Sequence, residues 1–131
     1  MAEGVPKIIA SDINSNFKVS AKEIEKAITD KTKMIIINSP NNPSGSIFSK
    51  KELDEIATVL RKYPNIFILS DEIYEHINYG VEHVSFASLE GMYERTITVN
   101  GIAKAFAMTG WRIGYIGCLL YTSPSPRDGL L

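Results

Sequence analysis

The stretch MIIINSPNNPSGSIFSKKELDEIATVLRKYPNIFIL, residues 34–69, decides the fold. The stretch begins and ends with short apolar runs, Met34–Ile37 and Ile66–Leu69, which do not alternate with polar residues. Continuous runs of this kind are typical of strands buried on both faces, as in a parallel sheet that helices cover. Between the runs, Ser49 and Glu52 form a capping-box pattern that precedes apolar residues at helical spacing. The stretch therefore predicts a strand–helix–strand unit with parallel strands.

Similar patterns flank this unit on both sides. Thr96–Val99 is a third apolar run, Val5–Ser11 is a fourth strand candidate that a proline weakens, and Ile113–Cys118 is a fifth that two glycines interrupt. Ser20 and Glu23 repeat the capping-box pattern and predict an earlier helix. Together the segments predict an α/β fold in which a mostly parallel sheet lies between helices.

Composition limits the class of protein. The 131 residues are the size of one ordinary domain or a piece of a larger one, with 44% apolar and 22% charged residues. The net charge of −1 provides no positive electrostatic potential that would attract nucleic acid or an anionic membrane. No apolar run is long enough to span a bilayer. Cys118 is the only cysteine, which excludes an internal disulfide and a multi-cysteine metal site. No signal-peptide pattern opens the sequence, so we expect a cytoplasmic protein.

Polar residues follow each of the three strongest runs. Asn38–Gly45 follows the first run, Ser70–Tyr74 the second and Asn100–Arg112 the third. In an open parallel sheet, ligands bind beyond the carboxyl ends of the strands. We therefore expect these three segments to meet at one edge of the sheet and to form the functional site.

The segments NSPNNPSG, SDEIY and NGIAKAFAMTGWRIGY closely resemble the fold-type I pyridoxal-phosphate aminotransferases, especially their aspartate-aminotransferase-like branch. The resemblance spans Glu3 to Gly117, and the combined motif is highly specific although each piece alone is weak. The resemblance implies a three-layer α/β/α fold, with Ile113–Gly117 antiparallel to Thr96–Val99. It also implies amino acid and 2-oxo acid substrates, a homodimer, no metal, and a cis peptide bond between Asn42 and Pro43.

The resemblance also implies a role for five side chains. Lys104 would bond covalently to the aldehyde of pyridoxal 5'-phosphate and later move the substrate proton. Asp71 would pair with the protonated pyridine nitrogen, so that the ring can accept electrons. Tyr74 and Asn42 would share the 3'-oxygen of the cofactor, and Arg112 would clamp its phosphate. The catalytic residues implied are Lys104, Asp71 and Tyr74, and all five would bind the cofactor.

Neighbouring polar and aromatic residues receive structural interpretations. Glu72 and Glu75 are predicted to lie on a solvated helix face. His76 and His83 have no metal partners at useful spacing and are predicted to be surface residues. Trp111 is predicted to serve packing.

The sequence also departs from the family pattern. Ser44 stands where the family usually has threonine, and Gly101 stands where many relatives have a phosphate-binding serine. The phosphate loop, the aromatic residue that stacks on the ring and the arginine of the small domain are not found. We therefore interpret residues 1–118 as part of the large cofactor-binding domain. Because the pattern breaks near Cys118, residues 119–131 are predicted to be foreign sequence or, second, a disordered linker.

Three alternatives stay open at this point. A C–S lyase or synthase of the same fold would use the same lysine, aspartate, tyrosine and arginine. Some transcription regulators carry an aminotransferase-like effector domain. Finally, the 131 residues by themselves would have no activity, and only a longer parent enzyme would catalyse transamination.

Overall fold

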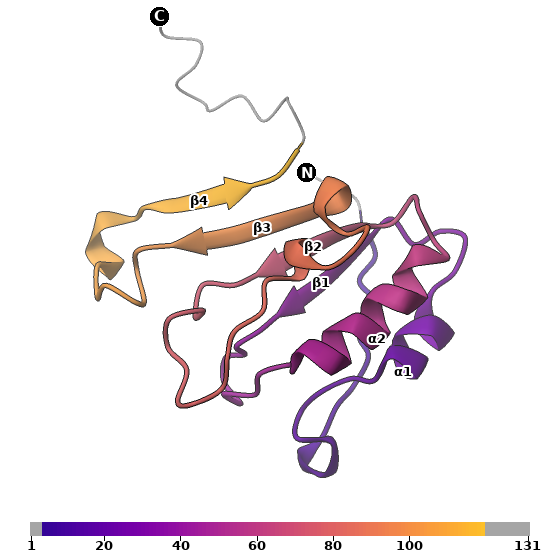
Figure 1. The fold of residues 1–131 in the computed structure, drawn as a ribbon, viewed down its shortest axis with the longest axis horizontal. Helices are drawn as coiled ribbons and strands as arrows, with labels where there is room; N and C mark the ends of the chain where they lie inside the picture. Colours follow the sequence, from indigo (N-terminus) through magenta and orange to yellow (C-terminus); the bar gives the residue numbers. More distant parts are fainter. Residues whose placement is uncertain (1–3, 120–131) are drawn as a thin grey trace, which may run out of the picture.

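The computed structural model describes residues 4–119 as a small sheet with helices packed against it (Figure 1). No helix in this range is long and apolar enough to cross a membrane. Four 3-10 turns accompany the regular elements: η1 (Ile13–Ser15), η2 (Phe86–Ser88), η3 (Tyr93–Arg95) and η4 (Thr109–Trp111). The regular elements, in chain order, are α1 (Ala21–Ala27), β1 (Met34–Asn38), α2 (Lys50–Arg61), β2 (Phe67–Asp71), β3 (Thr96–Gly101) and β4 (Gly114–Gly117).

The sheet has the order β1-β2-β3-β4, as Figure 1 shows. β1 pairs with β2 and β2 with β3 in parallel, and Ile36 lies opposite Leu69, which lies opposite Ile97. β4 runs antiparallel to β3, with Gly114 opposite Gly101. The mostly parallel α/β fold and the antiparallel last strand are therefore both confirmed.

Both predicted capping boxes form and begin the two helices. The Ser20 hydroxyl accepts from the backbone N–H of Glu23, whose carboxylate accepts from the Ser20 N–H, and this pair starts α1. Ser49 and Glu52 make the same reciprocal bonds at the start of α2. These bonds satisfy backbone donors that have no partner inside the helix.

The core lies between the two helices and one face of the sheet. α2 contributes one apolar stripe, and β1 and β2 contribute Ile37 and Ile68. The segment after β2 closes the core with Phe86, Leu89 and Met92. The stripe of α2 consists of Leu53, Ile56, Ala57 and Leu60.

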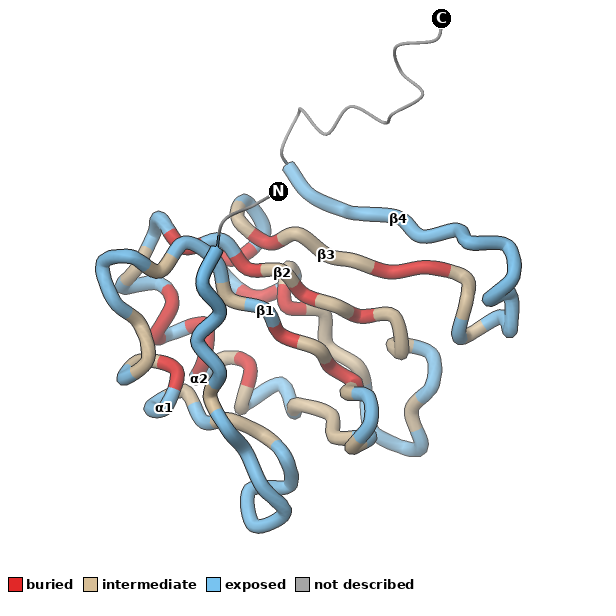
Figure 2. Tube along the Cα trace, turned by 180° about the vertical axis from the view of Figure 1, so that it is seen from behind, coloured by how far each residue is buried: buried red, intermediate tan, exposed pale blue. Residues whose placement is uncertain are grey.

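The opposite face of the sheet is not covered by the described residues, which corrects the prediction that the apolar runs are buried on both faces. Ile36 is 71% exposed, and Met34, Phe67 and Ile116 are exposed as well. Figure 2 shows β4 exposed along its whole length. Both helices of the described chain pack on the other side, so the third layer of the expected α/β/α arrangement is not formed by residues 4–119.

The expected strand at Val5–Ser11 does not form. This segment has no assigned strand, and Val5 and Ile8 are 94% and 87% exposed. Lys7 Nζ instead donates to the Ala27 carbonyl oxygen at the end of α1. Strand-forming residues alone do not make a strand, because the backbone of a strand needs a neighbouring strand for its hydrogen bonds. No strand of the described sheet pairs with this segment.

Candidate active site

The carboxyl ends of β1, β2 and β3 bring polar side chains together, as the sequence predicts. The Asn42 Nδ2 group donates to the Tyr74 hydroxyl at 3.2 Å, across 32 positions of the chain. The ammonium of Lys104 lies 5.8 Å from the centre of the Tyr74 ring. Three segments that follow three different strands therefore meet around one tyrosine.

Asp71 is the last residue of β2 and is half-buried. Its Oδ1 accepts a hydrogen bond from the Ile73 N–H at 3.2 Å, so the carboxylate closes a tight turn. The segment after Asp71 is a series of turns and not the predicted helix, with the Ile77 N–H donating to the Tyr74 carbonyl oxygen. Asp71 thus stands at the strand end with one of its oxygens used locally.

The sequence reasoning missed Asn38, the last residue of β1. Its Nδ2 donates to the Asp71 carbonyl oxygen at 3.1 Å. Its Oδ1 accepts from the Asn42 N–H at 3.1 Å and from the Asn41 side chain at 3.1 Å. One amide therefore ties the turn that carries Asn42 to the strand end that carries Asp71. The available signal was its place at the end of a buried strand, immediately before the Ser-Pro turn.

The turn after β1 is built from local hydrogen bonds. Both the Ser39–Pro40 and the Asn42–Pro43 peptide bonds are cis, and the second was predicted. The Ser44 hydroxyl donates to Asn41 Oδ1 at 2.8 Å, so the serine that replaces the expected threonine uses its hydroxyl within the turn. Gly45 adopts a positive φ of 71°, a conformation that side chains disfavour.

Among the described residues, Arg112 forms no hydrogen bond or ion pair with the cluster around Tyr74. Arg112 is exposed and donates from its guanidinium to the Thr109 carbonyl oxygen at 3.2 Å. The neighbouring Trp111 is 69% exposed, which corrects its predicted packing role within residues 4–119. Both residues lie between β3 and β4, and the guanidinium of Arg112 is exposed to solvent.

The close approach of two strands explains why glycine stands at position 101, where many relatives have serine. Gly101 pairs with Gly114, where β3 and β4 approach closely. A Cβ atom at position 101 would lie 2.9 Å from the Ile113 carbonyl oxygen and 3.2 Å from the Gly114 Cα. The backbone of this structure would therefore have to shift to accept a serine.

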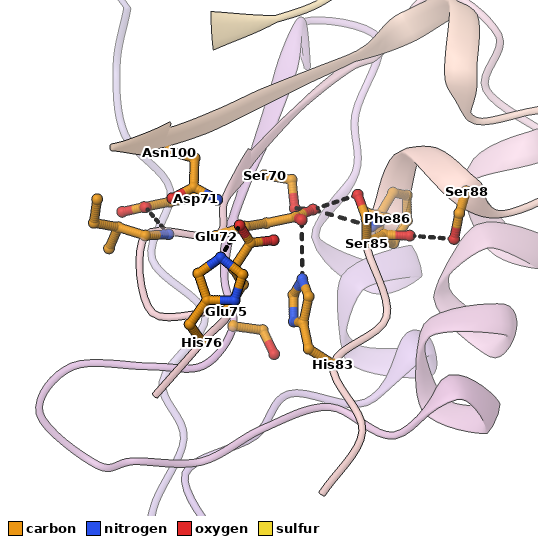
Figure 3. A network of polar contacts seen from close by, with 12 residues as sticks. Ser70, Asp71, Glu72, Glu75, His76, His83, Ser85, Phe86, Ser88 and Asn100 are labelled. Atoms are coloured by element: carbon orange, nitrogen blue, oxygen red, sulfur yellow. Dashed lines mark hydrogen bonds and ion pairs between the residues drawn. The ribbon is translucent and has the colours of Figure 1, made fainter. Parts of the chain in front are cut away.

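Glu72 and His83 correct a further prediction, because neither is a surface residue. Glu72 is only 2% exposed, and its Oε2 lies 3.0 Å from His83 Nε2, whose ring is largely buried (Figure 3). His76 is exposed as predicted, and its Nε2 lies 3.3 Å from a carboxylate oxygen of Glu75. The eleven positions between Glu72 and His83 carry no periodic signal, so the sequence gives no indication that the two side chains meet.

The donor set at the strand ends fits pyridoxal 5'-phosphate chemically. Asp71 offers a carboxylate for a protonated ring nitrogen, and Asn42 with Tyr74 offers an amide and a hydroxyl for a phenolic oxygen. Lys104 offers a primary amine close to that pair, which an aldehyde requires. Arg112 has an exposed guanidinium between β3 and β4, in the same connection that carries Lys104. The fit rests on the chemistry of these groups and on the Asn42–Tyr74–Lys104 contacts.

Comparison with known proteins gives a consistent result. The sequence model of the family described as "Aminotransferase class I and II" matches residues 1–119. The bifunctional aspartate aminotransferase and glutamate/aspartate-prephenate aminotransferase of Petunia hybrida is 48% identical over 117 residues, which are 88% of this chain and 24% of that protein. Aromatic-amino-acid aminotransferase 2 of Thermococcus litoralis is 49% identical over 88% of this chain and 30% of its own length.

A solved structure agrees with the fold. The aspartate aminotransferase from Rhizobium meliloti superposes with a TM-score of 0.86 at 47% identity, covering 88% of this chain and 30% of that one. The chain thus spans less than a third of the length of these relatives. The match of the family to 119 consecutive residues, together with the site geometry, leads to one conclusion. This chain belongs to the family of class I and II aminotransferases.

Proposed function

We propose that the protein carrying this chain transfers an amino group from an amino acid to a 2-oxo acid with the help of pyridoxal 5'-phosphate. The observation that carries the proposal is the meeting of Asn42, Tyr74 and Lys104 beside the end of β2, where Asp71 stands. The names of the relatives, which are aminotransferases for aspartate, prephenate and aromatic amino acids, support transamination over the lyase alternative.

When bound, the cofactor supplies an electron sink for the bond that breaks at the substrate Cα. Asp71 would hold the proton on the pyridine nitrogen through its carboxylate. The Asn42 amide and the Tyr74 hydroxyl, whose polar atoms lie 3.2 Å apart, would hydrogen-bond to the phenolic oxygen and orient the ring. The exposed guanidinium of Arg112 would bind the phosphate.

Lys104 has two tasks in this proposal. Its primary amine would hold the cofactor at the aldehyde carbon, and with substrate bound the same Nζ would accept the proton of the substrate Cα. The ammonium lies 5.8 Å from the centre of the Tyr74 ring, and the hydroxyl of the same tyrosine accepts a hydrogen bond from Asn42. This place lets one amine reach the reacting atoms while the tyrosine orients the ring.

The test uses the protein expressed from its complete reading frame. Borohydride reduction in the presence of pyridoxal 5'-phosphate, followed by peptide mapping, should label Lys104. Lys33→Arg, at an exposed position before β1, is the matched control and should keep the label. A label on another lysine would remove Lys104 from its proposed role.

The reaction itself is measured with aspartate or an aromatic amino acid as donor and a 2-oxo acid as acceptor. A new amino acid and a new 2-oxo acid, in equal amounts, support transamination. In a separate assay with a β-thioether amino acid and no acceptor, release of a thiol, ammonia and a 2-oxo acid, with no amino transfer in the first assay, would instead establish the lyase alternative. A helix-turn-helix segment in the complete reading frame, without turnover, would favour the regulator. We also propose a homodimer and a cytoplasmic location, which size-exclusion chromatography and cell fractionation would test.

A further inference from the structure

A buried carboxylate lies directly behind the candidate site. Glu72 follows Asp71 and is 2% exposed. Side chains alternate along a strand, so Ser70 and Glu72 share one face while Asp71 faces the other way. Figure 3 shows Ser70 and Glu72 turned toward Ser85 and Phe86, with Asp71 turned away from them. Glu72 therefore reaches into the core from the same strand end that carries Asp71 to the site.

Glu72 is fully engaged by hydrogen bonds. Its Oε1 accepts from the Ser70 and Ser85 hydroxyls at 2.9 Å each and from the Phe86 N–H at 3.1 Å, while Oε2 lies 3.0 Å from His83 Nε2. Burial alone would raise the pKa of Glu72, but the bonds from His83, Ser70, Ser85 and Phe86 outweigh burial and lower the pKa. A buried charge with these partners tolerates little displacement of any of them.

The partners of Glu72 come from both ends of one excursion of the chain. Ser70 belongs to β2, whereas His83, Ser85 and Phe86 follow the excursion of residues 73–82. Tyr74 lies on this excursion, two residues after Glu72, and its hydroxyl meets the Asn42 amide at 3.2 Å. The Glu72 N–H also donates to the Val99 carbonyl oxygen at 2.9 Å, which fixes the excursion to β3. One carboxylate thus joins the start and the end of the segment that carries Tyr74.

A metal ion is the competing interpretation of these groups. Glu72, Glu75 and His83 offer ligand atoms within 4.8 Å of one another. Both oxygens of Glu72 are, however, already accepting from hydroxyls, an N–H or the His83 ring, and Glu75 pairs with His76. The observed bonds therefore describe a structural network that needs no ion.

We propose that Glu72, held by His83, Ser85 and the Phe86 N–H, is a positioning residue that keeps Tyr74 in contact with Asn42. Glu72 does not touch the site groups and acts only through the segment it closes. The effect on cofactor binding rests on the proposed function, whereas the placement of Tyr74 does not. The two parts are therefore tested by separate measurements.

The first measurement needs no cofactor. Amide hydrogen exchange is followed by mass spectrometry in the protein from the complete reading frame, for the wild type, Glu72→Gln, Ser85→Ala and Glu52→Gln. Glu52 is the matched control, because this carboxylate also has a lowered pKa and also accepts several bonds, but at the start of α2. We expect Glu72→Gln to speed exchange in residues 73–82, Ser85→Ala to do so more weakly, and Glu52→Gln to act on α2 instead.

Unchanged exchange in residues 73–82 of Glu72→Gln would overturn the proposal. If Glu72→Gln fails to fold, Ser85→Ala removes one bond only and decides in the same way. These results hold whether or not the protein binds pyridoxal 5'-phosphate, so a failure of the proposed function is seen separately, as absence of binding by the wild type.

The second measurement is the dissociation constant for pyridoxal 5'-phosphate, from absorbance titration of the apo-protein. Glu72→Gln should weaken binding about tenfold, as expected when one oriented hydrogen bond is lost, while Glu52→Gln stays within about twofold. In a Tyr74→Phe background the effect of Glu72→Gln should fall below about threefold, because both changes remove the same contact. Equal losses in Glu72→Gln and Glu52→Gln, or full additivity with Tyr74→Phe, would show that Glu72 only supports stability.

Discussion

Single side chains at the strand ends have different partners, and the partners set what each one can do. Asp71 uses one oxygen in a local bond with the Ile73 N–H and is half-buried, so the rest of its carboxylate is available to a ligand. Glu72, the next residue, uses both oxygens inside the core. Two adjacent acids therefore have separate tasks, one toward the site and one toward the fold.

Asp71→Asn should lower the rate of amino transfer by about 10²–10³-fold, the usual cost of losing one well-placed charge interaction in a transition state. Some cofactor should stay bound, because Asn42, Tyr74, Lys104 and Arg112 are unchanged. Single-turnover absorbance kinetics measure the rate. Asp54→Asn, which removes only an exposed pair with Lys50, is the control and should leave the rate unchanged. A wild-type rate in Asp71→Asn would reduce Asp71 to a turn residue.

Glu72 should make the stability of the protein sensitive to acid. Its pKa is lowered in the fold from an ordinary value of 4.5, because the hydrogen bonds outweigh burial. The unfolded chain then binds a proton more readily, so the stabilisation is complete above pH 4.5 and is lost as the pH falls below it. The loss is measured as the free energy of unfolding in urea at a series of pH values from about 6 to about 3, which spans the ordinary pKa of 4.5. Glu72→Gln should show a shallower fall, and an equal fall would contradict the assignment.

At the scale of elements, the two capping boxes and the apolar stripe of α2 explain why helices form where they do. The Ser49 hydroxyl and the Glu52 carboxylate exchange bonds with each other's backbone N–H, and Lys18 adds a salt bridge to Glu52 at 2.7 Å. Ile56 and Leu60, four positions apart, are almost completely buried against the sheet. α2 thus has both a defined start and a packed face.

Ser49→Ala should destabilise the protein by about 1 kcal/mol, the usual cost of losing an N-cap side chain. The measurement is the urea midpoint at neutral pH, followed by circular dichroism. Ser88→Ala is a suitable control, because the Ser88 hydroxyl is exposed and bonds only to the Ser85 carbonyl oxygen three residues earlier. Equal midpoints for Ser49→Ala and the wild type would show that packing alone starts α2.

At the scale of the whole molecule, the sheet has one covered and one uncovered face. α1, α2 and the segment after β2 cover one side, whereas Ile36 is 71% and Ile116 58% exposed on the other. An apolar surface of this kind on a sheet favours association with other chains. The relatives are more than three times as long as the part this chain matches. They therefore have further residues available to cover a face of this kind.

The 131-residue chain produced by itself should therefore associate or stay loosely packed, and should not catalyse transamination. Ultracentrifugation, dye binding and thermal unfolding are the measurements. Ile36→Lys, which places a charge on the uncovered face, should reduce association, whereas a charge at the already exposed Tyr79, as in Tyr79→Lys, should not. A monomer with a sharp unfolding transition and a lysine-dependent absorbance band on adding pyridoxal 5'-phosphate would contradict this prediction.

Much of the fold and of the site was predictable because the deciding interactions are local. A capping box needs only two residues three positions apart, and both predicted boxes form. The three parallel strands follow from short apolar runs, and the family motifs at their ends predict which polar residues meet. The hydrogen bond from Asn42 to Tyr74 brings together two of the side chains that the motifs single out, while their roles toward a cofactor stay predictions.

Burial and pairing were decided only by the tertiary structure, because they depend on residues far apart in the chain. Glu72 is buried since His83, Ser85 and Phe86 return to it after an excursion of ten residues, and no local pattern shows that return. The segment 5–11 has strand-like residues but no neighbouring strand. The sequence by itself determined the family, the places of the three parallel strands along the chain and the starts of the helices, through patterns within a few residues. The tertiary structure decided which polar groups lie inside and which sheet face is covered, because burial is a property of the assembled surfaces.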